Sequence, residues 1–237
     1  MNGMPFDSEI FILTLVLGVY IAACALYRKT RVIILSPLFV SIFSLIIILQ
    51  AFGIEYEIFE RGSRFIHFMM GPAVVALGYT LFEQMKYLKG NVVSILTSVT
   101  VGSIVGIVSV IAVCKLMGAD DVMIYTLEPK SVTIPIALGI VEKSGGIPSI
   151  TTVVIVIVGL FGSIAGPPVL KALGIEDRIA KGLALGSASH AVGTTAAIQL
   201  GAVEGAISGL AIGLMGVATA IFVPVINAIM KYFGVLL

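Results

Sequence analysis

Long apolar segments separated by short polar connectors follow one another along almost the whole chain. A helix needs about 20 predominantly apolar residues to cross the hydrocarbon core of a membrane. Six segments approach or exceed that length: 10–27, 32–52, 65–82, 91–114, 145–170 and 205–230. The pattern therefore predicts about six full transmembrane helices.

The composition agrees with this pattern. Hydrophobic residues make up 59% of the 237 residues, charged residues only 11%, and the mean hydropathy is +1.15. Soluble domains carry roughly 25% charged residues, so this chain has too few polar groups to cover a water-exposed globule. The fold class we predict is an all-α polytopic membrane protein in contact with the lipid bilayer.

Two further hydrophobic segments are interrupted by polar and helix-breaking residues. The segment 122–146 contains the run EPKS at 128–131, and the segment 182–203 contains the run GSASH at 186–190. A backbone that leaves the helix at membrane depth must be buried in protein or line a wet cavity, because lipid cannot satisfy its N–H and C=O groups. We therefore expect these two segments to form the functional part of the chain.

The two interrupted segments also resemble each other. TIPIALGIVE at 133–142 and TAAIQLGAVE at 195–204 are identical at six of ten positions, and the same register sets Glu128 opposite His190. This similarity predicts an internal repeat. We accordingly divide the single membrane domain into a scaffold of N-terminal helices, residues 1–121, and a repeat-containing substrate-binding unit, residues 122–237.

Basic residues in short loops set the orientation of a membrane protein. The run RKTR at 28–31 places that loop in the cytoplasm and the N-terminus outside. The loop 171–181, with three basic residues, also lies in the cytoplasm if the segment 122–146 dips into the membrane and returns. The two segments would then enter from opposite sides as an inverted repeat, a pattern typical of secondary transporters. Crossing, unwound helices remain the alternative.

The run EPKSVT holds candidate residues for an anion site. An ionisable residue inside a membrane segment is a functional hypothesis by default, and the Lys130 ammonium needs an anionic partner, either Glu128 or a substrate carboxylate. Ser131 and Thr133 add hydroxyl groups, and the flanking prolines let a half-helix begin here, whose N-terminus favours an anion. The alternative is that Lys130 reaches the interface and pairs structurally with Glu128.

The second segment offers His190 among small and hydroxyl-bearing residues. The histidine can donate a hydrogen bond to a carboxylate or carry a proton near neutral pH; the alternative is a histidine satisfied in the core. Ser187, Ser189, Thr194 and Thr195 flank it. The full set of candidate substrate-binding residues is Glu128, Lys130, Ser131, Thr133, Ser187, Ser189, His190, Thr194 and Thr195.

Enzymatic readings find little support in the sequence. Lys130 and Ser131 are adjacent and point in different directions on a helix, which disfavours a Ser–Lys dyad. GSASH lacks the G-x-S-x-G pattern, and neither a P-loop, an HExxH motif nor a dinucleotide fingerprint is present. We expect no catalytic residue, cofactor, metal site or nucleic-acid partner.

The runs LEPKSVTIPIA, GGIPSITTVVIV, GLALGSASHAVGTTAA and LGAVEGAISGLAIGLMG resemble the LrgB/CidB family of bacterial inner-membrane proteins. Lys181 departs mildly from the arginine that is more usual there. The resemblance implies a bacterial inner-membrane location and an antiholin-like role in murein hydrolase activity and cell lysis, with an LrgA-type small membrane protein as partner. It also implies transport, because a plant relative resembles a plastidial glycolate/glycerate carrier and bacterial pairs are linked to pyruvate.

Our hypothesis from the sequence is a secondary transporter, or the transport subunit of one, for small monocarboxylates such as glycolate, glycerate or pyruvate. The substrate would bind between the two interrupted segments. The alternative is an antiholin-like interaction protein that modulates a holin-like pore. Glycine-rich helices make a homodimer a further hypothesis.

Overall fold

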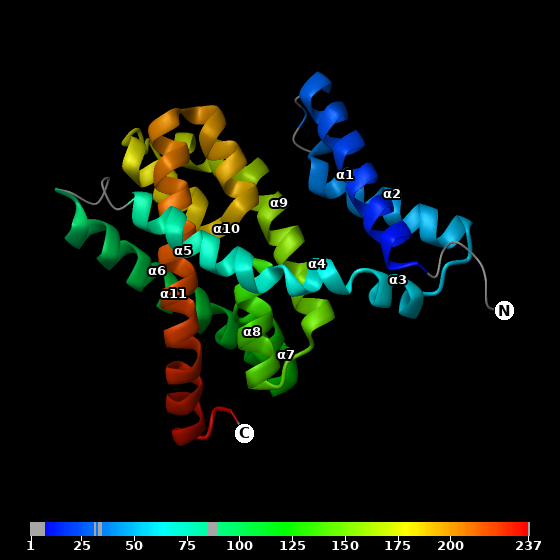
Figure 1. Cartoon of the computed structure of the whole chain (residues 1–237). Helices are drawn as coiled ribbons and strands as arrows, with labels where there is room; N and C mark the ends of the chain where they lie inside the picture. The colour runs from blue at the N-terminus through cyan, green and yellow to red at the C-terminus, as the bar shows by residue number, and fades with distance from the viewer. Residues whose placement is uncertain (1–7, 31, 33–34, 85–89, 237) are drawn as a thin grey trace. The chain divides into compact units, whose positions relative to one another are not determined.

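The computed structural model describes residues 8–30, 32, 35–84 and 90–236. Within these ranges the chain is helical and contains no strand (Figure 1). The helices are α1 (Glu9–Thr30), α2 (Pro37–Ala51), α3 (Tyr56–Gly62), α4 (Arg64–Phe68), α5 (Met70–Gln84), α6 (Val92–Leu116), α7 (Asp121–Leu127), α8 (Ile134–Ser144), α9 (Pro148–Ala172), α10 (Arg178–Leu200) and α11 (Ala202–Tyr232).

Four of the described helices, α1, α6, α9 and α11, are long and apolar enough to cross a membrane. Two of the six predicted spans are shorter than expected. Helix α2 has 15 residues because it begins at Pro37. Proline fits the first turn of a helix, but it lacks the backbone N–H that a position in the helix interior would need. The predicted span 65–82 is divided at Met69 between α4 and α5, just before Pro72. The structure thus describes an all-helical membrane protein with four long helices.

The chain forms two compact units, Met1–Ala73 and Val74–Leu237. In the first unit α1 packs against α2 and α3. Ile12 of α1 is fully buried, and Gly62 at the end of α3 lies so close to it that an added Cβ would collide with the Ile12 side chain. The division of function that we predicted at residue 121 stays a prediction; the contacts group α6 with the helices that follow it.

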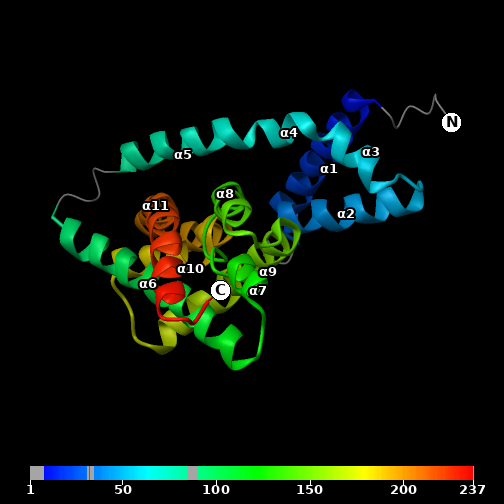
Figure 2. The same cartoon turned by 90° about the horizontal axis from the view of Figure 1, so that it is seen from below.

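The second unit is built around α11. One buried cluster joins the middle of α11, around Leu210 and Met215, to α6, α8, α9 and α10, and a second joins its lower half, around Val223 and Ile226, to α6, α7 and α8. Figure 1 shows α10 beside the upper part of α11 and α7 with α8 beside its lower part. Figure 2, turned by 90°, shows α6 and α8 next to α11.

The first interrupted segment folds back on itself. Helix α7 ends at Leu127, residues 128–133 form turns, and α8 returns until Gly145, whose φ of 85° ends the helix. The chain then meets α7 again, because the Ile147 N–H donates to the Thr126 hydroxyl over 2.9 Å and the Thr151 hydroxyl donates to the Thr126 carbonyl over 2.8 Å. The predicted break is confirmed, and its two arms form a helical hairpin.

The second interrupted segment, α10, is also a hairpin. Its backbone leaves the helix at Ser189 (φ −135°, ψ 15°) and His190 (φ 42°, ψ −135°). After this turn Gly193 lies directly against the carbonyl of Leu185, where a Cβ would collide. A positive φ at a residue with a side chain is strained, so the surrounding packing must hold His190 in this conformation.

Neighbours on α11 give the direction of each arm of α10. In the first arm, Gly182 lies against Ile207 and Gly186 against Ala211, so this arm runs parallel to α11. In the second arm, Thr194 contacts Ser208 and Ile198 contacts Gly205, so that arm runs antiparallel. The segment therefore returns to the end of the unit from which it entered.

The two hairpins enter the second unit from opposite ends. Asn91 at the start of α6 and Asp177 at the start of α10 line the same pocket, so both lie at one end. Lys115 and Asp121, which form an ion pair of 2.7 Å, connect α6 to α7 at its other end. This geometry agrees with the dipping form of the first segment; the repeat and the side of the membrane that each hairpin faces stay predictions.

Gly186→Ala tests the packing of α10 on α11. The added methyl group would collide with the Ser208 carbonyl and the Ala211 side chain, and overpacking of this kind costs about 1–3 kcal/mol. We expect a lower unfolding temperature in detergent. Gly209→Ala is the control, since nothing lies within 4 Å of its Cβ position. Equal stability of the two variants would contradict the hairpin packing.

Candidate functional site

Lys130 lies in the turn between α7 and α8. Its side chain is half-buried, and its amine lies 3.4 Å from the Ser131 hydroxyl. Among the described residues no carboxylate lies within 4 Å of this amine, since the single ion pair found there joins Lys115 to Asp121. Within the part of the chain that the structure describes, the Lys130 amine thus has no carboxylate at ion-pair distance.

Glu128, two residues earlier, points to a different neighbour. Its side chain is 2% exposed, and its Oε2 accepts a hydrogen bond of 2.9 Å from the Asn227 amide of α11. The sequence left open an ion pair between Lys130 and Glu128, and the structure does not contain it. The turn at 128–131 separates the two side chains and directs the carboxyl group against α11.

Thr133 immediately precedes α8 and extends the polar character of this turn. Its backbone is extended (φ −68°, ψ 148°), its carbonyl begins the hydrogen bonding of α8, and its Oγ1 is buried without a hydrogen-bond partner. The N-terminus of an α-helix carries partial positive charge. A lysine amine, two hydroxyl groups and a helix N-terminus therefore come together on one turn, and each of them favours an anion.

His190 forms the tip of the second hairpin. The ring is 5% exposed, and its Nε2 lies 3.0 Å from the carbonyl of Ile155 on α9. Because a carbonyl only accepts hydrogen bonds, Nε2 carries the proton in this contact. Gly159 makes room for the ring, since a Cβ there would collide with it. The bond fixes the ring against α9 and leaves Nδ1 as its other nitrogen.

The remaining predicted residues of this segment divide between two surroundings. Ser189 is 1% exposed and packs against Gly162, and Thr194 bonds the Ser208 hydroxyl over 2.7 Å, so both hold the hairpin in place. Thr195 is exposed and contacts the Ala191 carbonyl of its own helix. These contacts make Ser189 and Thr194 positioning residues and leave Thr195 on the outer face.

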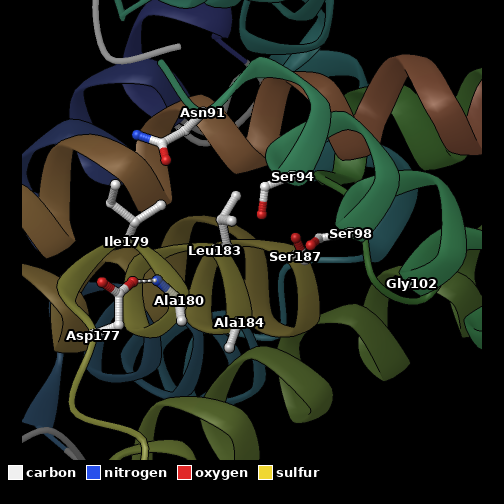
Figure 3. A pocket seen from close by; sticks show the side chains of 10 residues that line it. All are labelled: Asn91, Ser94, Ser98, Gly102, Asp177, Ile179, Ala180, Leu183, Ala184 and Ser187. Atoms are coloured by element: carbon white, nitrogen blue, oxygen red, sulfur yellow. Dashed lines mark hydrogen bonds between the residues drawn. The ribbon is translucent and has the colours of Figure 1, made fainter. Parts of the chain in front are cut away.

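Ser187 faces a pocket of about 400 Å³ between α6 and the first arm of α10 (Figure 3). The hydroxyl groups of Ser94 and Ser98 from α6 point toward the same space as that of Ser187. The pocket begins at Asn91 and Asp177, whose carboxylate caps α10 by accepting from the Ala180 N–H over 2.8 Å. It is a hydroxyl-lined groove that ends two residues before the break at Ser189.

One buried cluster links the tip of the first hairpin to the residue of α9 that holds the tip of the second. Val132, from the first tip, packs in the same cluster as Ile155, whose carbonyl holds His190 at the second tip. The cluster also includes Leu210 and Ala211 from the middle of α11. The first tip and Ile155, the hydrogen-bond partner of His190, therefore belong to the same buried cluster.

Several polar residues of this region were missed by the sequence interpretation. Asn227, Ser208, Ser94 and Ser98 all lie in apolar helices and were taken as ordinary parts of membrane spans. The signal that could have found Asn227 is its amide within the long apolar run 205–230. Ser94 and Ser98 follow each other at a spacing of four, which places them on one helix face.

The chain is similar to known proteins along most of its length. The model of the LrgB-like family matches residues 16–229 of the chain. The chain belongs to the LrgB-like family. It is 35% identical to YxaC of Bacillus subtilis strain 168 over 92% of this chain and 94% of that protein. It is also 35% identical to the antiholin-like protein LrgB of Bacillus mycoides, over 80% of this chain and 82% of that protein.

Membership of the LrgB-like family confirms the resemblance found in the sequence and, with the long apolar helices, describes a multi-pass membrane protein. The LrgB relatives are named antiholin-like proteins, which fits our alternative interpretation better than carboxylate transport. No solved structure matches the chain.

Thiol labelling tests the groove of Figure 3. In a Cys24→Ala background that keeps the buried Cys114, we expect Ser98→Cys to react with a membrane-impermeant reagent from the cytoplasmic side only, because the groove opens at the end that our charge argument places there. Ser103→Cys is the control, since that position is 1% exposed. Equal labelling of the two positions, or none, would contradict a water-filled groove.

Proposed function

We propose that this protein is a carrier, or the transport subunit of one, for small monocarboxylates. The observation that carries this proposal is Lys130, a half-buried amine without a carboxylate within 4 Å among the described residues. An unpaired charge inside an apolar bundle is unfavourable. A transient anionic ligand would balance it during each transport cycle.

The surroundings of Lys130 favour a carboxylate that carries a further polar group. The Ser131 hydroxyl lies 3.4 Å from the amine, and the buried Thr133 Oγ1 has no partner. A hydroxyl group can donate a hydrogen bond to the keto oxygen of a small acid, and it can donate to or accept from the hydroxyl group of such an acid. Glycolate, glycerate and pyruvate share this chemistry, so the proposal extends to the class and not to one member.

The two hairpins support a transport cycle. Broken helices within one bundle are the usual place for a substrate site in secondary transporters. The hydroxyl-lined groove between α6 and α10 would give one side of the membrane access to this region. We further propose that the hairpins form an inverted repeat in the bacterial inner membrane, with the N-terminus outside.

The second candidate is an antiholin-like interaction protein. The observation that favours it is the similarity to several relatives that are named antiholin-like proteins. In that role the chain would bind a small membrane protein of the LrgA type and modulate a pore, and Lys130 would have no ligand. A homodimer is compatible with either candidate.

Uptake of labelled pyruvate, glycolate and glycerate into proteoliposomes tests the proposal. We expect Lys130→Met to weaken substrate binding by roughly 10- to 100-fold, because charge-assisted hydrogen bonds contribute about 1.5–3 kcal/mol. Lys143→Met is the matched control, since Lys143 is an exposed lysine of α8. His190→Ala should also reduce uptake, because the hairpin tip loses its bond to Ile155.

Size-exclusion profiles must show that each variant is folded. Normal uptake by Lys130→Met would overturn the proposed role of Lys130. If the wild-type chain takes up none of the three acids, alone or with an LrgA-type protein, the carrier proposal fails. Retention of a lysis phenotype and of partner binding in Lys130→Met cells would then favour the antiholin-like role.

A further inference from the structure

We propose that Glu128 and Asn227 form a proton-binding site that is distinct from the anion site at Lys130. The proposal rests on the proposed carrier function where it concerns coupling, and on geometry alone where it concerns the proton. Glu128 closes α7, and Asn227 lies 99 residues later in the lower half of α11, so the site joins the first hairpin to the central helix.

The hydrogen bonding of this pair is incomplete. The Asn227 amide nitrogen donates to Oε2 of Glu128 over 2.9 Å. The other carboxyl oxygen, Oε1, and the amide oxygen Oδ1 are both buried and have no hydrogen-bond partner among the described residues. Glu128 is 2% exposed and Asn227 7% exposed, so bulk water does not reach either group freely. Two acceptor oxygens therefore lie in the same buried pair without a donor.

One proton corrects this imbalance. A carboxyl group protonated on Oε1 becomes a donor, and Oδ1 of Asn227 is the unpartnered acceptor on the same pair of side chains. Protonation also removes a buried negative charge, which is very unfavourable when no cation balances it. The neutral acid is thus the form that this arrangement stabilises.

A metal cation suits the site less well than a proton. Hard cations such as Ca²⁺ and Mg²⁺ require about six or more oxygen ligands, and the pair supplies two unpartnered oxygens. The neighbouring carbonyls of Ile124, Leu127 and Pro129 already accept hydrogen bonds from Glu128, Lys130 and Val132. The chemistry available here is that of a single proton.

The charged and titratable groups around the pair do not replace this proton. From α6, the Cys114 thiol is buried nearby, and Lys115 is bound to Asp121. From α11, the Lys231 amine lies over the Tyr125 ring, 5.6 Å from its centroid. Helix α9 contributes the hydroxyl of Thr151, which is bonded to Thr126, and on α8 Glu142 and Lys143 are exposed.

The location of the site suggests how a proton would be coupled to transport. When Glu128 loses its proton, three acceptor oxygens and one donor group remain between α7 and α11, and the carboxylate becomes a buried charge. The contact between the hairpin and α11 is then weakened, and the hairpin that carries Lys130 is free to move. Binding of the proton would favour the packed state seen in this structure.

Infrared spectroscopy of the purified protein tests the proton itself, independently of transport. We expect a protonated-carboxyl C=O band at neutral pH that is lost in Glu128→Gln and kept in Glu142→Gln, a control at an exposed glutamate of α8. Asn227→Ala should shift the frequency of the band, because the carboxyl group loses its hydrogen-bond partner. No such band, or a band that Glu128→Gln leaves unchanged, would overturn the proton site.

Transport tests the coupling. In proteoliposomes we expect Glu128→Gln to lose accumulation driven by a proton gradient, while Glu142→Gln keeps it. Loss of exchange in folded Glu128→Gln would overturn the distinction between the two sites and place Glu128 at the anion. If the wild-type protein transports none of the acids but shows the Glu128 band, the carrier proposal fails and the proton site stands.

Discussion

The packing of the second unit follows one constraint, which is that a backbone that leaves the helix among apolar helices must find its hydrogen bonds within the protein. The chain breaks twice, at 128–133 and at Ser189–His190. Both breaks are enclosed by α9 and α11. The second hairpin can lie close to these helices because glycines stand at the contacts. Gly159 and Gly162 of α9 make room for the tip of the hairpin, and Gly186 of the hairpin lies directly against α11.

Most of the buried polar groups that this packing creates are paired across elements. Thr151 bonds the Thr126 carbonyl, His190 bonds the Ile155 carbonyl, and Thr194 bonds Ser208. Each of these bonds joins a hairpin to a long helix. These bonds hold the first hairpin against α9 and the second hairpin against α9 and α11.

The buried polar groups without a hydrogen-bond partner are concentrated at the first hairpin. In the second unit, as far as the structure describes it, the buried side-chain atoms without a partner are Oγ1 of Thr133, Oε1 of Glu128 and Oδ1 of Asn227, and Lys130 has no anion. All four residues lie in or next to the turn of the first hairpin. These groups are the observations on which our two proposals rest, an anion site at Lys130 and a proton site at Glu128 and Asn227.

The sequence by itself determined the class of the protein, the two interruptions and the family, because hydropathy, prolines and charges act locally and each leaves its mark within a few residues. It placed α1, α6, α9 and α11 well and overestimated the length of α2, which Pro37 shortens. Only the tertiary structure decided which partner each polar residue has. Glu128 accepts a hydrogen bond from Asn227, 99 residues away, and forms no ion pair with its neighbour Lys130. The turn at 128–131 and the path of α11 bring these two side chains together, and neither can be read from the residues around Glu128.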